Sequence, residues 1–132
     1  MEGSAIVEGF FRLRERGTTV GTEVKAGVTT FMVMVYIVAV NPLILSNAGI
    51  DIGAAAAATA LVAGVMTILM GLVSNYPIAI AAGLGLNGVV AFGLVIGAGL
   101  TPAGAMGVVV LEGIVVTVLV VVGLREAVMN AV

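Results

Sequence analysis

The 132-residue chain is 61% hydrophobic and only 9% charged, with a mean hydropathy of +1.31. Soluble domains are about half apolar and a quarter charged, so this composition predicts an integral membrane protein. A net charge of −2 offers no basic surface to a nucleic acid. Without histidine or cysteine, the usual zinc sites, disulfides and thiol chemistry are excluded from this chain, and we expect neither an enzyme nor a cofactor or metal site.

Residues 1–25 are polar, with a small apolar group at Phe10, Phe11 and Leu13. This mixture predicts a segment that lies on an anionic lipid surface, with a solvated tail as the alternative for the first eight residues. Four of the five basic residues precede the first apolar span: Arg12, Arg14, Arg16 and Lys25. Because basic residues favour the cytoplasmic side, we expect the N-terminus in the cytoplasm.

The first two predicted spans cover about 26–45 and 52–73. Asn41 and Pro42 interrupt the outer end of the first span, since proline lacks a backbone donor. Asn41 then either satisfies the local backbone or contacts a ligand, and the sequence leaves both roles open. Asp51 is the expected N-cap of the second span, which is rich in alanine and glycine and predicts a closely packed scaffold helix.

The third predicted span, about 77–98, is interrupted in its first half. Pro77 is followed by Ile78–Ala81, where large and small residues alternate with period two, and then by Gly83 and Gly85. These residues predict a short strand and then a half-helix. Six extended residues cover roughly 20 Å at about 3.3 Å each, which reaches past the middle of a hydrocarbon core about 30 Å thick.

Irregular backbone at that depth is tolerated where it lines a binding site, and transporters present half-helix N-termini to their substrates. The backbone at Gly83, Leu84 and Gly85, together with the Asn87 side chain, is therefore the candidate substrate-binding group. The alternative is one continuous helix from Pro77 to about residue 98, in which the glycines serve helix packing and Asn87 an interhelical hydrogen bond.

The fourth predicted span, about 102–122, starts with Thr101 as N-cap and Pro102 at the first helical position. Glu112 lies near its midpoint, where a charge costs about 2.5 to 3.5 kcal/mol on insertion scales. Glu112 is thus either a proton-exchanging carboxylate or a structural one bonded to a neighbouring helix. Arg125 follows the span, so both ends are expected in the cytoplasm. A last apolar pattern, 127–132, stops abruptly and predicts a truncated chain.

A series of short motifs occurs along the chain: Thr22-Glu23, Ala26-Gly27-Val28-Thr29-Thr30-Phe31, Tyr36-Ile37, Asn41-Pro42, Asn75-Tyr76-Pro77-Ile78-Ala79, Gly83-Leu84-Gly85-Leu86-Asn87, Glu112-Gly113 and Leu124-Arg125-Glu126-Ala127. Through these motifs the residues from Phe10 to Val132 resemble the nucleobase/cation symporter family 2 of the xanthine/uracil permease superfamily, in particular its azaguanine-type permeases for hypoxanthine, guanine and adenine. The family usually has proline where Ala82 stands and commonly threonine where Val33 stands.

The resemblance implies fourteen spans in two inverted seven-span repeats, with a core domain of spans one to four and eight to eleven and a separate gate domain. The nucleobase lies between the third and tenth spans, each a short strand plus half-helix. Residues 26–132 would then be the four-span first part of the core domain. The carboxylates for substrate and proton lie mainly in the absent eighth and tenth spans, so this chain alone should not transport.

The leading hypothesis is therefore a fragment of a purine nucleobase transporter, a proton symporter of the plasma (inner) membrane. Its expected partners are a purine nucleobase, a proton, membrane lipid, the remaining spans and a second copy in a homodimer. One alternative is a small four-span multidrug/proton antiporter acting as a dimer with Glu112, although those proteins usually carry their glutamate in the first span, which here has none. A non-transporting membrane scaffold subunit is the other alternative, favoured by an unbroken third helix.

Overall fold

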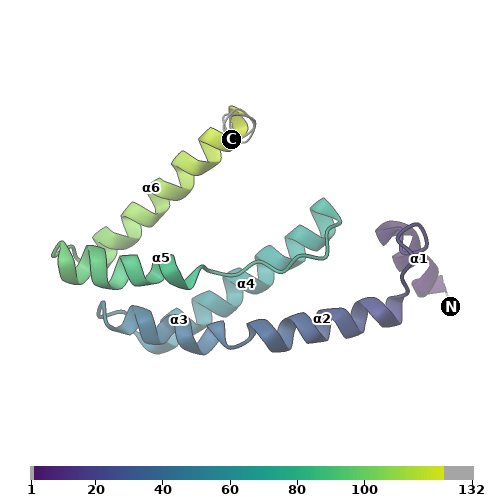
Figure 1. Ribbon diagram of the computed structural model, residues 1–132, viewed down its shortest axis with the longest axis horizontal. Helices are drawn as coiled ribbons and strands as arrows, with labels where there is room; N and C mark the ends of the chain where they lie inside the picture. Colours follow the sequence, from purple (N-terminus) through teal and green to yellow (C-terminus); the bar gives the residue numbers. More distant parts are fainter. Residues whose placement is uncertain (1, 124–132) are drawn as a thin grey trace.

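The computed structural model describes residues 2–123, and over this range the chain is all-helical (Figure 1). The helices are α1 (Glu2–Phe11), α2 (Val20–Met34), α3 (Ile37–Ser46), α4 (Ile52–Ser74), α5 (Leu84–Gly88), the π-helix η1 (Val89–Gly97) and α6 (Pro102–Val121).

Helices α2 and α3 follow one another end to end and form the first apolar run, Val20–Ser46 (Figure 1). It starts six residues before the predicted span because Thr19 caps α2, its hydroxyl accepting from the Thr22 N–H at 3.3 Å. Between the two helices the pairing tightens: the Val38 N–H donates to the Val35 carbonyl, three residues back, at 3.1 Å.

Helices α4 and α6 begin at the caps that the sequence predicts. The Asp51 carboxylate accepts from the Ala54 N–H at 2.7 Å. The Thr101 hydroxyl accepts from the Gly104 N–H at 3.1 Å, and Pro102 is the first helical residue. Both cap predictions are confirmed.

Three helices are long and apolar enough to cross a membrane: Val20–Ser46, Ile52–Ser74 and Pro102–Val121. They correspond to the first, second and fourth predicted spans. The predicted third span contains a shorter apolar helix, Leu84–Gly97, so three rather than four spanning helices are found in the described range. Most large apolar side chains on these helices are exposed, as expected where lipid or further spans provide the surroundings.

The chain from Tyr76 to Gly83 is neither helix nor strand and crosses beside α4 (Figure 1); we call it the extended segment, although it begins with a tight turn in which the Ile78 N–H donates to the Tyr76 carbonyl at 2.9 Å. The predicted short strand is wrong, because residues 2–123 contain no strand. A strand needs a neighbouring strand to pair with its backbone. Here one side chain of α4 takes that place: the Ile80 N–H donates to the Thr67 hydroxyl oxygen at 3.0 Å, and that hydroxyl lies 3.2 Å from the Ile80 carbonyl, to which it donates.

Helical pairing resumes at Leu84. The Asn87 N–H donates to the Gly83 carbonyl at 3.3 Å, and from Val89 the helix widens to π-type pairing that ends with the Ala98 N–H on the Gly93 carbonyl at 2.9 Å. A continuous helix from Pro77, the alternative interpretation of the sequence, is therefore not observed.

A small core forms where α3, α4, η1 and α6 meet. Its buried members are Leu45, Ala55, Val90 and Ala105, one from each helix. Helix α3 packs on α4, α5 and η1, and α6 packs on η1. Because Ala105 has no exposed surface, its small side chain allows the close approach of α6 to the other helices. This core fixes the place of α5 beside α3.

Replacing Thr67 with valine tests the attachment of the extended segment. Valine keeps the shape of threonine but leaves the Ile80 N–H and carbonyl without partners, and each unpaired group costs about 1–3 kcal/mol. We expect amide hydrogen exchange around Ile80 to accelerate at least about tenfold in lipid nanodiscs, since 1.4 kcal/mol is a factor of ten. Thr67→Ser should exchange like the wild type. Equal rates in all three proteins would contradict this role of Thr67.

Candidate functional site

The start of the helix at Leu84 carries unpaired backbone donors. Because the Asn87 N–H is the first to bond within the helix, the N–H groups of Leu84, Gly85 and Leu86 have no helical acceptor. Gly83, at the N-cap, offers no side chain to bond them. The predicted residues Gly83, Leu84, Gly85 and Asn87 thus lie together at one helix start, where the partial positive charge of the helix favours an electron-rich ligand atom.

The two glycines at this start do not have the backbone role that the sequence suggested. Gly83 has φ −77° and ψ 117°, which any residue adopts. A Cβ added at Gly83 or Gly85 would meet nothing within 4 Å, and both residues are exposed. Within residues 2–123, therefore, the two glycines leave open space at the start of the helix.

A chain of side-chain hydrogen bonds joins the helix start to α3 and α4. The Asn87 amide nitrogen donates to the Asn41 carboxamide oxygen, the Asn41 amide nitrogen donates to the Thr59 hydroxyl at 2.7 Å, and that hydroxyl donates to the Ala55 carbonyl at 2.7 Å. We call Asn87, Asn41 and Thr59 the polar relay. Asn41 is 4% exposed and Thr59 9%, whereas Asn87 is half-buried, so the relay joins three helices and is buried at its Asn41–Thr59 end.

The relay settles what the Asn41 side chain bonds. It bonds side chains of α4 and α5 rather than the local backbone. The interhelical hydrogen bond that the alternative interpretation assigned to Asn87 is also observed. This bond uses one amide hydrogen of Asn87, so the carboxamide oxygen and the second hydrogen remain for another partner.

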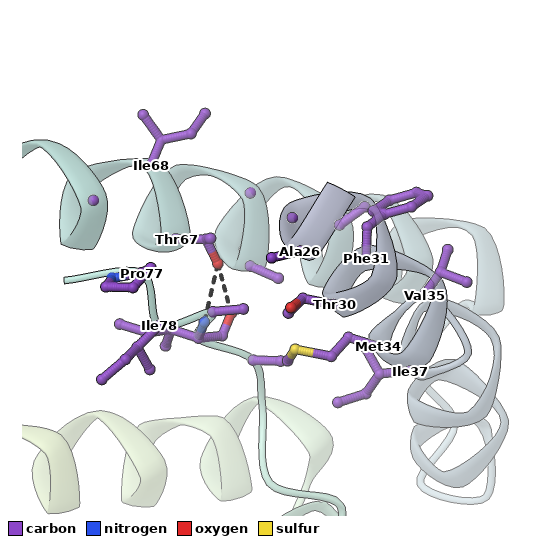
Figure 2. A pocket seen from close by; sticks show the side chains of 18 of the residues that line it. Ala26, Thr30, Phe31, Met34, Val35, Ile37, Thr67, Ile68, Pro77 and Ile78 are labelled. Atoms are coloured by element: carbon purple, nitrogen blue, oxygen red, sulfur yellow. Dashed lines mark hydrogen bonds between the residues drawn. The ribbon is translucent and has the colours of Figure 1, made fainter. Parts of the chain in front are cut away.

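A cavity of about 510 Å³ lies between α2, α4 and the extended segment (Figure 2). Its wall is mainly apolar, and Thr30 and Thr67 contribute hydroxyls. In Figure 2 Thr67 points from α4 toward the extended segment, where its two hydrogen bonds to Ile80 are drawn. Glu23 and Tyr76 also belong to the lining.

The predicted binding residues do not line this cavity: Gly83, Leu84, Gly85 and Asn87 lie beyond its end at Ala81. Glu112 does not line this cavity either. It is exposed on α6, and residues 2–123 provide it with no hydrogen bond or ion pair. The structure therefore brings four of the five predicted residues together and leaves Glu112 separate.

The N-terminal segment contacts the other end of the extended segment. Asn75 ends α4 in the left-handed conformation, φ 52°, and its amide nitrogen donates to the Phe10 carbonyl at 2.9 Å. The Arg16 guanidinium lies 6.0 Å from the centre of the Tyr76 ring, a cation–π distance. Leu13 is buried here, beside a cavity of about 310 Å³.

Thr59 and Thr67 are the functional candidates that the sequence analysis missed. They lie eight residues apart on α4, a spacing that places both on one broad face of a helix. Two hydroxyls on one face of an otherwise alanine- and leucine-rich span were the available signal.

A family model described as a permease family, of the xanthine/uracil type, matches residues 21–132. The chain belongs to this permease family. The match confirms the resemblance carried by the sequence motifs. Membership of a permease family agrees with the three helices that are long and apolar enough to cross a membrane.

Three of the relatives carry the names of purine permeases. The adenine permease AdeP of Escherichia coli K12 is 51% identical over 98 residues, which is 74% of this chain and 22% of the relative. The guanine/hypoxanthine permease PbuO of Bacillus subtilis is 43% identical over 124 residues, 92% of this chain and 29% of the relative. The guanine/hypoxanthine permease GhxP of Escherichia coli O157:H7 is 42% identical over 120 residues, 91% of this chain and 27% of the relative.

The chain thus spans between about a fifth and three tenths of the length of these relatives. No solved structure matches it significantly.

Replacing Asn75 with glycine tests the contact between α4 and the N-terminal segment. Glycine adopts the left-handed conformation at no cost, so α4 should end as before, but the hydrogen bond to Phe10 is lost. A hydrogen bond of this kind contributes about 0.5–1.5 kcal/mol, so we expect tryptic cleavage after Arg12, Arg14 and Arg16 to accelerate about two- to tenfold. Ser74→Ala, one residue earlier, is the control. Identical cleavage rates would show that Asn75 does not hold the segment.

Proposed function

We propose that this chain forms the first four spans of a purine nucleobase permease that works by proton symport. The observation that carries the proposal is the helix start at Leu84, which combines backbone N–H groups without a helical acceptor, open space at Gly83 and Gly85, and the Asn87 carboxamide. The names of the relatives, adenine and guanine/hypoxanthine permeases, supply the substrate class.

In this proposal the extended segment and the following helix together make the third crossing. The five residues of α5 and the nine of η1 amount to about 20 Å of helix, less than a hydrocarbon core of about 30 Å. The segment from Asn75 to Gly83 supplies the remaining length.

The membrane placement follows from charge. Residues 1–25 form the cytoplasmic segment at the lipid surface, and residues 26–132 belong to the transporter core domain. Both ends of this chain then face the cytoplasm, and the membrane is the plasma (inner) membrane. The other spans, surrounding lipid and a second copy are the partners that would cover the exposed apolar faces of α4 and α6.

A purine fits the chemistry of the helix start. Its flat ring carries nitrogen and carbonyl acceptors and N–H donors along one edge. The N–H groups of Leu84 and Gly85 would donate to an acceptor on that edge, and Asn87 would add a directional contact. The absence of side chains at Gly83 and Gly85 lets the ring approach the backbone closely.

The family membership supports the permease over the two alternatives. A small four-span multidrug antiporter would need Glu112 at its centre, but Glu112 lies apart from the helix start. A non-transporting scaffold subunit was favoured by a continuous third helix, and helical pairing is interrupted before Leu84.

Replacing Asn87 with alanine in the full-length transporter should weaken purine uptake. The loss of one neutral hydrogen bond costs about 0.5–1.5 kcal/mol, which corresponds to a rise in KM of about two- to tenfold. Initial uptake rates of radiolabelled adenine and hypoxanthine measure this effect. The amount of protein in the membrane, followed by immunoblot, should stay constant. Unchanged uptake kinetics would remove Asn87 from the binding site.

Replacing Glu112 with glutamine separates its two candidate roles. Glutamine keeps the capacity for hydrogen bonding but cannot exchange a proton. Because no second intramembrane charge lies within residues 26–122 to partner it, we expect a structural role, with purine uptake and its dependence on external pH both retained. Uptake that no longer responds to pH would instead place Glu112 in proton coupling.

A further inference from the structure

The hydrogen bond from Thr59 to the Ala55 carbonyl fixes the donor and the acceptor in every other bond of the polar relay. The Thr59 hydroxyl has one hydrogen, and it donates that hydrogen to the Ala55 carbonyl at 2.7 Å. Toward Asn41 it can therefore only accept, so the Asn41 amide nitrogen must face Thr59. The Asn41 oxygen then faces Asn87, and Asn87 must present its own amide nitrogen.

We propose that Thr59 and Asn41 are positioning residues that hold the Asn87 side chain in one orientation, with its carboxamide oxygen free to accept a hydrogen bond from an N–H group of the substrate. This inference rests on the proposed function and specifies its substrate contact. Asn87 Oδ1 has no hydrogen-bond partner in residues 2–123, yet it is not among the buried atoms that lack one, so it is exposed to solvent. The Asn87 side chain bonds Asn41 through its nitrogen, so both lone pairs of Oδ1 remain available to accept a hydrogen bond.

Burial makes the orientation costly to change. If the Asn87 carboxamide turned over, two oxygens would face each other between Asn87 and Asn41, and a buried unpaired polar group costs about 1–3 kcal/mol. Asn41 cannot compensate by turning as well without facing its oxygen to Thr59, which already donates to Ala55. Pro42, beside Asn41, is fully buried and further limits movement of α3.

The fixed orientation gives the site a defined hydrogen-bonding edge. The backbone N–H donors of Leu84 to Leu86 and the carboxamide acceptor of Asn87 belong to four consecutive residues at the start of one helix. A substrate with an acceptor and an N–H donor side by side matches this edge, as an amide or amidine edge of a purine does. A purine methylated at the donor nitrogen should be a poor substrate.

The experiment compares three threonine variants of the full-length transporter. Thr59→Val keeps the side-chain shape but removes the acceptor for Asn41, Thr59→Ser keeps the hydroxyl, and Thr117→Val is the matched control. The Thr117 hydroxyl is exposed and bonds only the Gly113 carbonyl of its own helix, at 2.7 Å. The readouts are KM and maximal rate of purine uptake per transporter, and amide hydrogen exchange across residues 83–90.

We expect Thr59→Val to raise KM about three- to tenfold and to accelerate exchange across residues 83–90, with a nearly unchanged maximal rate, because one buried polar group loses its partner. Thr59→Ser and Thr117→Val should match the wild type in both readouts. If Thr59→Val fails to insert, Thr59→Ala removes the same hydroxyl without the branched methyl group.

Two results would overturn the inference. In one, Thr59→Val leaves both KM and exchange unchanged. In the other, it lowers the maximal rate or the protein amount while KM stays constant, which is the signature of a purely structural residue. A wild-type protein that takes up no purine would contradict the proposed function instead, and the exchange across residues 83–90 would still test the positioning of the helix start.

Discussion

The structure depends on how one interrupted stretch of backbone finds hydrogen-bond partners inside an apolar protein. Between Asn75 and Gly83 the chain has neither helix nor strand pairing. An unpaired backbone group in hydrocarbon costs several kcal/mol, so such a stretch persists only where side chains or neighbouring segments supply partners. Thr67 supplies both the donor and the acceptor for Ile80, and the helix resumes three residues after Ala81, at Leu84.

Helix α4 is consequently more than a scaffold of small residues. Its hydroxyls at Thr59 and Thr67 hold the two parts of the predicted third crossing, the helix start through Asn41 and the extended segment through Ile80. A rigid helix that carries both attachments fixes the distance between them. That is the arrangement by which a binding edge is kept within a few tenths of an ångström of its working geometry.

Much of the local structure could be predicted because its signals are local. Asp51 and Thr101 cap helices through atoms three residues away, and the interruption before Leu84 begins next to Pro77, which lacks a backbone donor. The predicted strand was wrong because its existence depends on a partner that no local pattern reveals. Thr59 and Thr67 were missed because a threonine in an apolar helix commonly bonds its own backbone, as Thr29 and Thr117 do. Only the three-dimensional structure distinguishes such a threonine from one whose hydroxyl bonds another segment of the chain, as those of Thr59 and Thr67 do.

Gly83 and Gly85, at the helix start, face open space rather than other residues of the described chain. Neither Gly83 nor Gly85 is required by backbone conformation, and an added side chain would meet nothing in residues 2–123. The space they leave lies in the first turn of a helix whose initial N–H groups have no helical acceptor and which also carries Asn87. Relatives in the family are more than three times longer than the matched segment. In a permease of that length, a substrate and the later spans would close over this edge, so the glycines would serve a close approach that this chain alone does not contain.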